Sequence, residues 1–503
     1  MTDAANRVEG MGSATRLALG LLACVGCLGL LLVASPARSQ AAASKPLSLA
    51  VSHPKLGSGA SVNFWLSRAG DQTNGAGAGL YHHYVTWRTI APANPTASFD
   101  PTDPDDPQYD FSRLDQVVRA VAANGMESMM SVYSAPDFAE GAGRPASAFP
   151  GTWKPSPSAY ADFATALATR YSGSHVPPGD STALPRVGKF EAWNESNLAT
   201  FLTPQMKGKK LVGADHYRKL VNAFYSAVHA VQPDAKVAAG ATAPFGAYYG
   251  AKAKKYIPPL RFLRRLLCLR EAGRGKLKRA CGAKVSLDAL SHHPISNQRG
   301  KFTNPAKKPS NPDDLSASNF GKLRTLLRSA ERLGRVVSSG TGARELWATE
   351  IWEFSNPPDP KCGVSLAKQA RNIQQSMYLI ASQGASSIHY YTIGDIEPEQ
   401  LCFWTGSGLY KSNGVPKPAL TGFRFPFVTV RNSKGVNAWG RAPVSGTVVI
   451  ERLKGGWREV ASVPVTAGNT FNALLGKLRG PGRYRASVGG QTSLTWSQSS
   501  GRW

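Results

Sequence analysis

Two glutamates stand in the most distinctive runs of the chain. Glu195 lies in FEAWNESN (residues 190–197), and Glu350 lies in LWATEIW (residues 346–352). Each run begins with a short β-like stretch, so each glutamate stands where a strand ends. Two carboxyl groups facing each other across a cleft can break a glycosidic bond. One of them protonates the leaving oxygen, and the other, ionised, attacks the anomeric carbon or activates water.

Eight β-like segments, most of them separated by a helical segment, precede residue 426. They cover residues 47–51, 81–86, 127–133, 188–194, 236–241, 286–291, 345–349 and 387–392. This alternation predicts an α/β fold with a parallel sheet, and eight units predict a (β/α)8 TIM barrel over residues 44–425. A doubly wound open sheet is the alternative, but the chain lacks the glycine-rich motifs of nucleotide-binding folds. In a barrel, both glutamates lie at the carboxyl ends of strands, on the face where active sites form.

Two helices illustrate the helical segments. Residues 112–124 read as a helix with Ser112 as its N-cap, Asp115 completing a capping box and Gly125 following its end. Residues 216–231 place their apolar side chains on one helical face.

The pattern changes after residue 426. Residues 446–453, 457–465, 470–475, 482–488 and 492–496 read as strands, with no helical segment between them. They predict a small all-β sandwich over residues 426–503. Such a module serves as a packing or spacer element, or binds carbohydrate with Trp457 as a platform.

The amino-terminal residues 1–43 resemble an export signal. Arg7 and Arg16 precede an uncharged, mostly apolar run over residues 17–37, and the small residues Ala41–Ala43 follow it. This order is typical of a cleaved secretory signal peptide. An uncleaved membrane anchor is the alternative, since the run is long enough to span a bilayer. Either reading predicts a secreted or cell-envelope protein.

Four cysteines remain after the signal: Cys268, Cys281, Cys362 and Cys402. An even number in an exported chain predicts two disulfides. Pairing of neighbours in the sequence gives Cys268–Cys281 and Cys362–Cys402, although four cysteines allow three connectivities. No C-x2-C pair remains to suggest zinc. We therefore predict no metal and no cofactor.

The chain is strongly basic. It has 59 Lys and Arg against 32 Asp and Glu, a net charge of +27, and residues 252–279 alone hold eleven basic residues and one acid. Part of that segment reads as an outer barrel helix, with Leu260, Leu263, Leu266 and Leu267 on one face. A solvated basic face, an anionic glycan and nucleic acid are the alternatives, and export together with the absence of a recognised module disfavours nucleic acid. We expect these basic loops on the face where the glutamates open, and we leave the oligomeric state open.

The two glutamate runs resemble motifs of glycoside hydrolase clan A, the retaining TIM-barrel glycosidases. WNES is similar to the strand-four motif of that clan, and ATEIW to its strand-seven motif. The resemblance implies that Glu195 is the acid/base, Asn194 the ligand of the sugar 2-hydroxyl, and Glu350 the nucleophile. Within the clan the chain looks most like exported bacterial enzymes of families 39 and 5, over residues 80–418.

The resemblance also implies contacts to the sugar. His293, in the run HHP at the end of the sixth strand, is expected to line the sugar subsite. Ile295 replaces the aromatic residue that often bonds the nucleophile, so that support must come from elsewhere. His82 stands where relatives commonly carry Arg, and a neutral imidazole lowers a carboxylate pKa less than a guanidinium does. The expected aromatic walls are Trp352, Tyr391 and Trp404.

Other functions use the same residues. A non-catalytic barrel that binds carbohydrate at the cell surface keeps the aromatic cleft, and a transglycosylase differs only in its acceptor. Further carboxylates near predicted strand ends are Asp137, Glu353 and Asp395, as subsite contacts or as the nucleophile in place of Glu350. Glu191 alternates to the same strand face as Glu195, and we read it as an interior carboxylate paired with a base.

Overall fold

The computed structural model describes most of the chain beyond the predicted signal. It covers residues 45–56, 60–247, 251–273, 275–296, 304–338, 340, 343–396, 401–402, 404–478 and 480–499, and all of them belong to one compact unit. The predicted signal peptide, residues 1–43, lies outside these residues. Among the described helices, none has both the length and the apolar character needed to cross a membrane.

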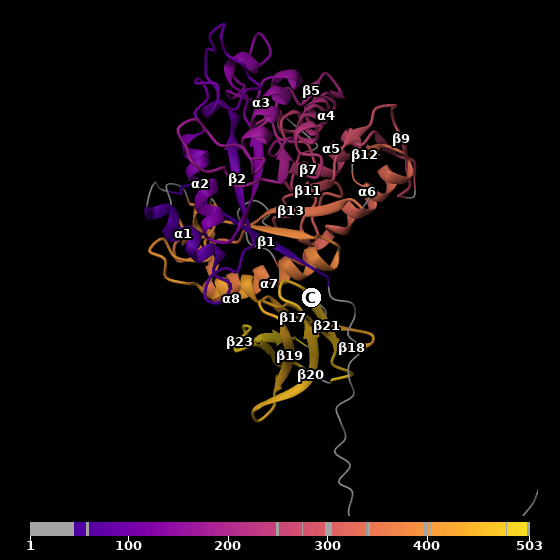
Figure 1. The fold of residues 1–503 in the computed structure, drawn as a ribbon. Helices are drawn as coiled ribbons and strands as arrows, with labels where there is room; N and C mark the ends of the chain where they lie inside the picture. Colours follow the sequence, from indigo (N-terminus) through magenta and orange to yellow (C-terminus); the bar gives the residue numbers. More distant parts are fainter. Residues whose placement is uncertain are drawn as a thin grey trace, which may run out of the picture. The chain divides into compact units, whose positions relative to one another are not determined.

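Eight parallel strands close into a barrel (Figure 1). In chain order they are β1 (Ser48–Ser52), β2 (Leu80–Thr86), β3 (Glu127–Tyr133), β4 (Lys189–Ala192), β7 (Lys236–Thr242), β11 (Ala289–His292), β13 (Glu345–Ile351) and β16 (Ser387–Tyr391). Each pairs with its sequence neighbours, and β16 closes the ring against β1. The predicted TIM barrel is confirmed, and each strand overlaps the segment expected for it.

The barrel strands are connected largely through helices. These are α1 (Ala60–Gly70), α2 (Ser112–Ala123), α3 (Pro157–Arg170), α4 (Gly213–Val231), α5 (Pro259–Leu266), α6 (Gly321–Arg332), α7 (Leu366–Ser382) and α8 (Pro418–Arg424). In α4, Tyr217, Leu220, Phe224 and Val228 are fully buried and recur at helical spacing, as expected.

The predicted capping box of α2 is wrong. Its N-cap is Phe111, which makes no side-chain cap, and the Ser112 hydroxyl instead donates to Asp110. A serine hydroxyl can bond a nearby side chain or backbone group instead of capping a helix, and here it bonds the carboxylate two residues earlier. Gly125 does follow the helix end, with a φ of 71°.

The carboxyl-terminal segment forms two antiparallel sheets, as expected for a sandwich. One contains β17 (Phe427–Asn432), β18 (Gly435–Arg441) and β21 (Thr470–Leu474). The other contains β19 (Gly446–Leu453), β20 (Trp457–Val465), β22 (Gly482–Val488), β23 (Gln491–Thr492) and β24 (Trp496–Gln498). The Trp457 ring is partly covered by the Arg485 guanidinium, 4.3 Å from the ring centroid.

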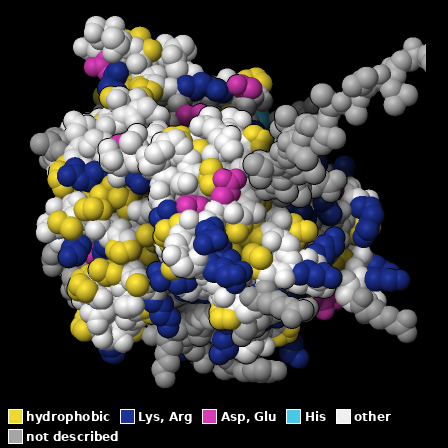
Figure 2. All heavy atoms as spheres, turned by 90° about the horizontal axis from the view of Figure 1, so that it is seen from below, with side chains coloured by type: hydrophobic (Ala, Val, Ile, Leu, Met, Phe, Trp, Pro, Cys, Tyr) yellow, Lys and Arg dark blue, Asp and Glu magenta, His cyan; other side chains and the backbone are white. Residues whose placement is uncertain are grey.

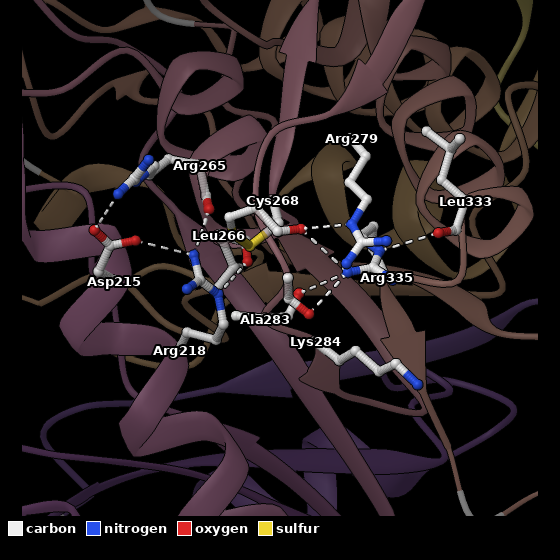
Figure 3. The surroundings of a disulfide bond; sticks show 12 residues. Asp215, Arg218, Arg265, Leu266, Cys268, Arg279, Ala283, Lys284, Leu333 and Arg335 are labelled. Carbon is white, nitrogen blue, oxygen red and sulfur yellow. Dashed lines mark hydrogen bonds and ion pairs between the residues drawn. A yellow bond between two sulfur atoms is a disulfide. The ribbon is translucent and has the colours of Figure 1, made fainter.

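Both disulfides have the sequence-local pairing. Cys362–Cys402 joins the loops that follow β13 and β16, while Cys268–Cys281 closes the hairpin of β8 (Leu269–Glu271) and β9 (Leu277–Arg279). Figure 3 shows the surroundings of Cys268, where the Arg335 guanidinium points at backbone carbonyls. Arg335 donates to the carbonyls of Cys281, Gly282, Ala283 and Leu333 and is only 6% exposed. The hairpin is thus held by a covalent bond and a buried cation.

The basic segment is divided between two regions. Lys252, Lys254 and Lys255 lie in the loop after β7, on the side where barrel active sites form. Arg270 and Lys278 lie on the hairpin, which follows α5 and precedes β11. The expectation that these basic loops lie on the face where the glutamates open thus fits the three lysines but not Arg270 and Lys278, because α5 ends at Leu266 and the chain has by then left the strand ends. In Figure 2, Lys and Arg side chains are also spread widely over the face seen from below.

Candidate active site

A tight turn after β4 sets the position of Glu195. The strand ends at Ala192, and both Trp193 and Glu195 take positive φ values, 72° and 38°, which non-glycine residues rarely adopt. The buried Trp193 indole N–H donates to the carbonyl of Phe201 at 2.9 Å, which ties the turn to the following loop. The turn brings the Glu195 carboxylate to the carboxyl end of the barrel.

Glu350 comes from the end of β13 and accepts two side-chain hydrogen bonds. The Tyr84 hydroxyl donates to Oε2 at 2.8 Å, and the Trp352 indole N–H donates to Oε1 at 2.9 Å. An indole N–H can only donate, so Oε1 is held as an acceptor. Both oxygens are therefore oriented before any substrate arrives.

His293 brings the two carboxylates together. Its Nδ1 lies 3.2 Å from Oε1 of Glu195 and 3.6 Å from Oε2 of Glu350, and the side chain is fully buried. Burial opposes protonation, but the charges of Glu350 and Glu195 outweigh it and raise the pKa of His293 to about 9. At neutral pH the two carboxyl groups thus share one imidazolium.

The pKa of Glu350 reflects opposing influences. Burial raises it and the negative charge of Glu195 adds to that effect, while His293 and the hydrogen bonds from Tyr84 and Trp352 lower it. The outcome is a pKa above the ordinary value for glutamate. Burial and the charge of Glu195 thus make Glu350 harder to ionise than an ordinary glutamate.

The glutamates open into a cleft of about 1090 Å³. Its walls include Tyr84, Tyr133, Phe201, Tyr256, Trp352 and Tyr391. Asn194 lies beside Glu195 in the same wall, and its buried Oδ1 has no hydrogen-bond partner among the described residues. A cleft with aromatic walls and a few convergent polar groups suits a ligand that has apolar faces and hydroxyl edges, as sugars do.

The remaining predicted contacts fall in different places. Trp352 and Tyr391 line the cleft, and Tyr391 meets Tyr84 edge to face at 5.4 Å. His82 lies in the barrel interior at the floor of the cleft, only 1% exposed. The side chain of Trp404 lies outside the described residues.

The alternative carboxylates have other partners and do not line the cleft. Glu353 is buried and accepts from Asn372, Asp395 pairs with Lys417 at 2.6 Å, and Asp137 pairs with Arg88 at 3.4 Å. Of the carboxylates singled out in the sequence, Glu195 and Glu350 line the cleft; Asp110 also lines it and accepts hydrogen bonds from Ser112.

Tyr84 is the residue that the sequence prediction missed. Its hydroxyl supplies the hydrogen bond to Glu350 that the residue after the sixth strand often supplies, while Ile295 at that point only lines the wall. A signal was present, because Tyr84 and His82 alternate to the same face of β2. The contact across the barrel to Glu350 cannot be read from the sequence.

Comparisons with known proteins give structural similarity at low sequence identity. No protein-family model matches the chain, and no curated protein matches it. A family 39 glycoside hydrolase from Bacteroides cellulosilyticus WH2 is 15% identical with a TM-score of 0.48, covering 86% of this chain and 81% of its own. A monomeric beta-xylosidase from Caulobacter crescentus CB15 is 14% identical with a TM-score of 0.47, covering 88% of this chain and 98% of its own. A glucosidase from Croceicoccus marinus is 13% identical with a TM-score of 0.47, covering 87% of this chain and 96% of its own.

Proposed function

We propose that this protein is a retaining glycoside hydrolase that acts by double displacement. The observation that carries the proposal is the bridge at His293, where one nitrogen lies within 3.6 Å of an oxygen of each glutamate. Because both distances start from the same nitrogen, these two oxygens are at most 6.8 Å apart, whereas inverting enzymes hold their carboxyl groups about 6.5–9.5 Å apart to leave room for a water. This upper limit excludes most of the inverting range and allows the retaining spacing of about 5–5.5 Å, which supports the proposal.

In the first step, Glu350 attacks the anomeric carbon and forms a glycosyl ester. The bond from that carbon to the leaving oxygen breaks, and Glu195 gives its proton to that oxygen. The donors on Glu350, Tyr84 and Trp352, stabilise its ionised form and aim it.

In the second step, water attacks the same carbon. Glu195, now ionised, takes a proton from the water, and the ester bond breaks to restore the Glu350 carboxylate. Two inversions at one carbon give net retention of configuration.

The substrate class follows from the cleft. Asn194 offers an unpartnered buried oxygen beside Glu195, where it can accept a hydrogen bond from a sugar hydroxyl. Trp352 and Tyr391 offer faces on which a sugar ring can stack. We infer an oligo- or polysaccharide substrate, and an exported location from the predicted signal.

A panel of aryl β- and α-glycosides, with the first-formed product anomer followed by NMR, tests this function. A product of retained configuration from the wild type, together with loss of turnover in Glu350→Gln, supports it. An inverted product overturns the retaining mechanism. Tight binding of a glycan without turnover of any glycoside points instead to the non-catalytic carbohydrate-binding barrel, and transfer to a sugar acceptor in preference to water points to a transglycosylase.

A further inference from the structure

A chain of hydrogen bonds crosses the barrel interior beneath the cleft. Nε2 of His82 lies 2.6 Å from the Ser131 hydroxyl, which in turn donates to Oε2 of Glu191. Nδ1 of His82 lies 3.2 Å from Nδ1 of His389, whose Nε2 lies 2.8 Å from the Ser387 hydroxyl. All five side chains are at most 4% exposed, so the chain is shielded from bulk water.

The number of protons fixes the direction of every bond. Burial is the main influence that lowers the pKa of His82 well below its usual value, with His389, His293 and His83 adding to it. Burial likewise lowers the pKa of His389 to about 3, so both rings are neutral and each carries one proton. The Ser131 hydroxyl donates its only proton to Glu191, so in its contact with His82 it must accept the proton on Nε2.

The remaining protons then follow in order. His82 has no proton left for Nδ1, so the bond between the two rings needs the Nδ1 proton of His389. Nε2 of His389 then accepts from Ser387. The tautomers of two buried histidines are thus set by a carboxylate at the far end of the chain.

This hydrogen-bond chain contacts the active site through Tyr84. The His82 ring stacks on the Tyr84 ring, with centroids 4.5 Å apart and planes 28° apart, and the Tyr84 hydroxyl donates to Glu350. A ring fixed at both nitrogens cannot turn without breaking buried hydrogen bonds, which is costly. His82 therefore gives Tyr84 a rigid support.

We propose that the hydrogen-bond chain Ser387–His389–His82–Ser131–Glu191 holds His82 as its Nε2–H tautomer and makes His82 a positioning residue that acts through Tyr84 on Glu350. The role of Glu350 in this statement rests on the proposed function. The tautomer assignment does not, because it depends on the buried contacts and on the neutral state of the two rings.

Selective 15N labelling of histidine tests the assignment without any substrate. Two-bond proton–nitrogen couplings identify the nitrogen that carries each proton. We expect protons on Nε2 of His82 and Nδ1 of His389 in the wild type between pH 6 and 8. A doubly protonated His82, or the reverse pair of tautomers, overturns the proposal.

A matched pair of buried carboxylates gives the control. Glu191→Leu removes the acceptor at the end of the chain, so the Ser131 proton turns to His82 and the proton of His82 leaves Nε2. Glu353→Leu removes a carboxylate that bonds Asn372 outside the chain and leaves both tautomers unchanged. A change in both variants, or in neither, contradicts the proposal, and the wild-type assignment decides alone if Glu191→Leu does not fold.

A double-mutant cycle tests the positioning role. His82→Gln keeps a hydrogen-bonding amide but loses the stacked ring, and it should lower kcat about tenfold with little change in KM. In a Tyr84→Phe background, where the hydroxyl on Glu350 is already gone, the same change should lower kcat less than threefold. If kcat of the double variant falls by the product of the two single-variant factors, His82 does not act through Tyr84. If no glycoside is turned over, the proposed function fails while the tautomer assignment is still decided by NMR.

Discussion

The ends of β4 and β13 present the same functional group in different settings. The side chains of Glu195 and Glu350 are similarly accessible, 18% and 14% exposed, and both reach Nδ1 of His293. Glu350 also accepts from Tyr84 and Trp352, one donor on each oxygen, whereas His293 is the one hydrogen-bond partner found for the Glu195 carboxylate among the described residues.

This difference fits the roles proposed for the two glutamates. A carboxylate that must attack carbon benefits from fixed donors, because they hold it in one orientation and favour its ionised form. A carboxyl group that gives a proton and then takes one back must lose and regain its hydrogen, and fixed donors on both oxygens would hinder that. The setting of Glu350 suits the nucleophile and that of Glu195 suits the acid/base.

The largest expected effect comes from Glu350. Glu350→Gln should lower kcat by roughly 10⁴-fold or more while the thermal transition changes little, because the amide fits the same space. Glu350→Ala with azide should regain activity and give a glycosyl azide of inverted configuration, since azide replaces the carboxylate on the same face. An azide product of retained configuration assigns the nucleophile role to Glu195 instead.

Glu195 should show a smaller loss that depends on the leaving group. Glu195→Gln should lower kcat about 10²–10³-fold for an alkyl glycoside. A dinitrophenyl glycoside has a leaving group that needs no protonation, so the rate of the first step should change little. Dinitrophenol should then be released in a burst while the glycosyl-enzyme accumulates. An equal loss for both leaving groups contradicts the acid role.

Tyr84→Phe should reduce kcat about 10- to 100-fold, the value of one hydrogen bond to a charged group. Because the Tyr84 bond lowers the pKa of Glu350, its loss raises that pKa further. The nucleophile must be ionised, so activity falls as the pH drops through this pKa, and the acidic limb of the kcat/KM profile should move to higher pH. An acidic limb that does not move contradicts the contact.

The sequence predicted the barrel because each of its strands is a buried run with a clear pattern. It placed Glu195 and Glu350 at strand ends for the same reason. The hairpin of Arg270 and Lys278 was missed, since charged side chains exposed to solvent leave no hydrophobic alternation to detect. The contact of Tyr84 with Glu350 joins residues 266 apart and depends on how the barrel closes.

The two disulfides should differ in their effect on activity more than on stability. They close loops with separations of 13 and 40 residues, which the chain-entropy model values at roughly 3–4 kcal/mol each. Cys362→Ser/Cys402→Ser frees the loops that follow the strands carrying Glu350 and Tyr391, and kcat should fall several-fold. Cys268→Ser/Cys281→Ser should lower Tm with kcat within twofold. The reverse pattern in kinetic assays well below both Tm values contradicts this division.

The smallest expected effect concerns the charge near the cleft. Lys252, Lys254 and Lys255 are exposed and directly precede Tyr256 of the cleft wall, whereas Arg270 and Lys278 lie on the distant hairpin. If the substrate is an anionic polysaccharide, changing the three lysines to Ser should raise KM a few-fold at low salt and leave a neutral aryl glycoside unaffected, because surface charges steer only charged ligands. Arg270→Ser/Lys278→Ser is the matched control and should not change KM. Added salt should raise the KM of the wild type for the anionic substrate toward that of the lysine variant, because screening removes the same electrostatic attraction. A flat salt response on every anionic glycan tested assigns the lysines to a solvated surface.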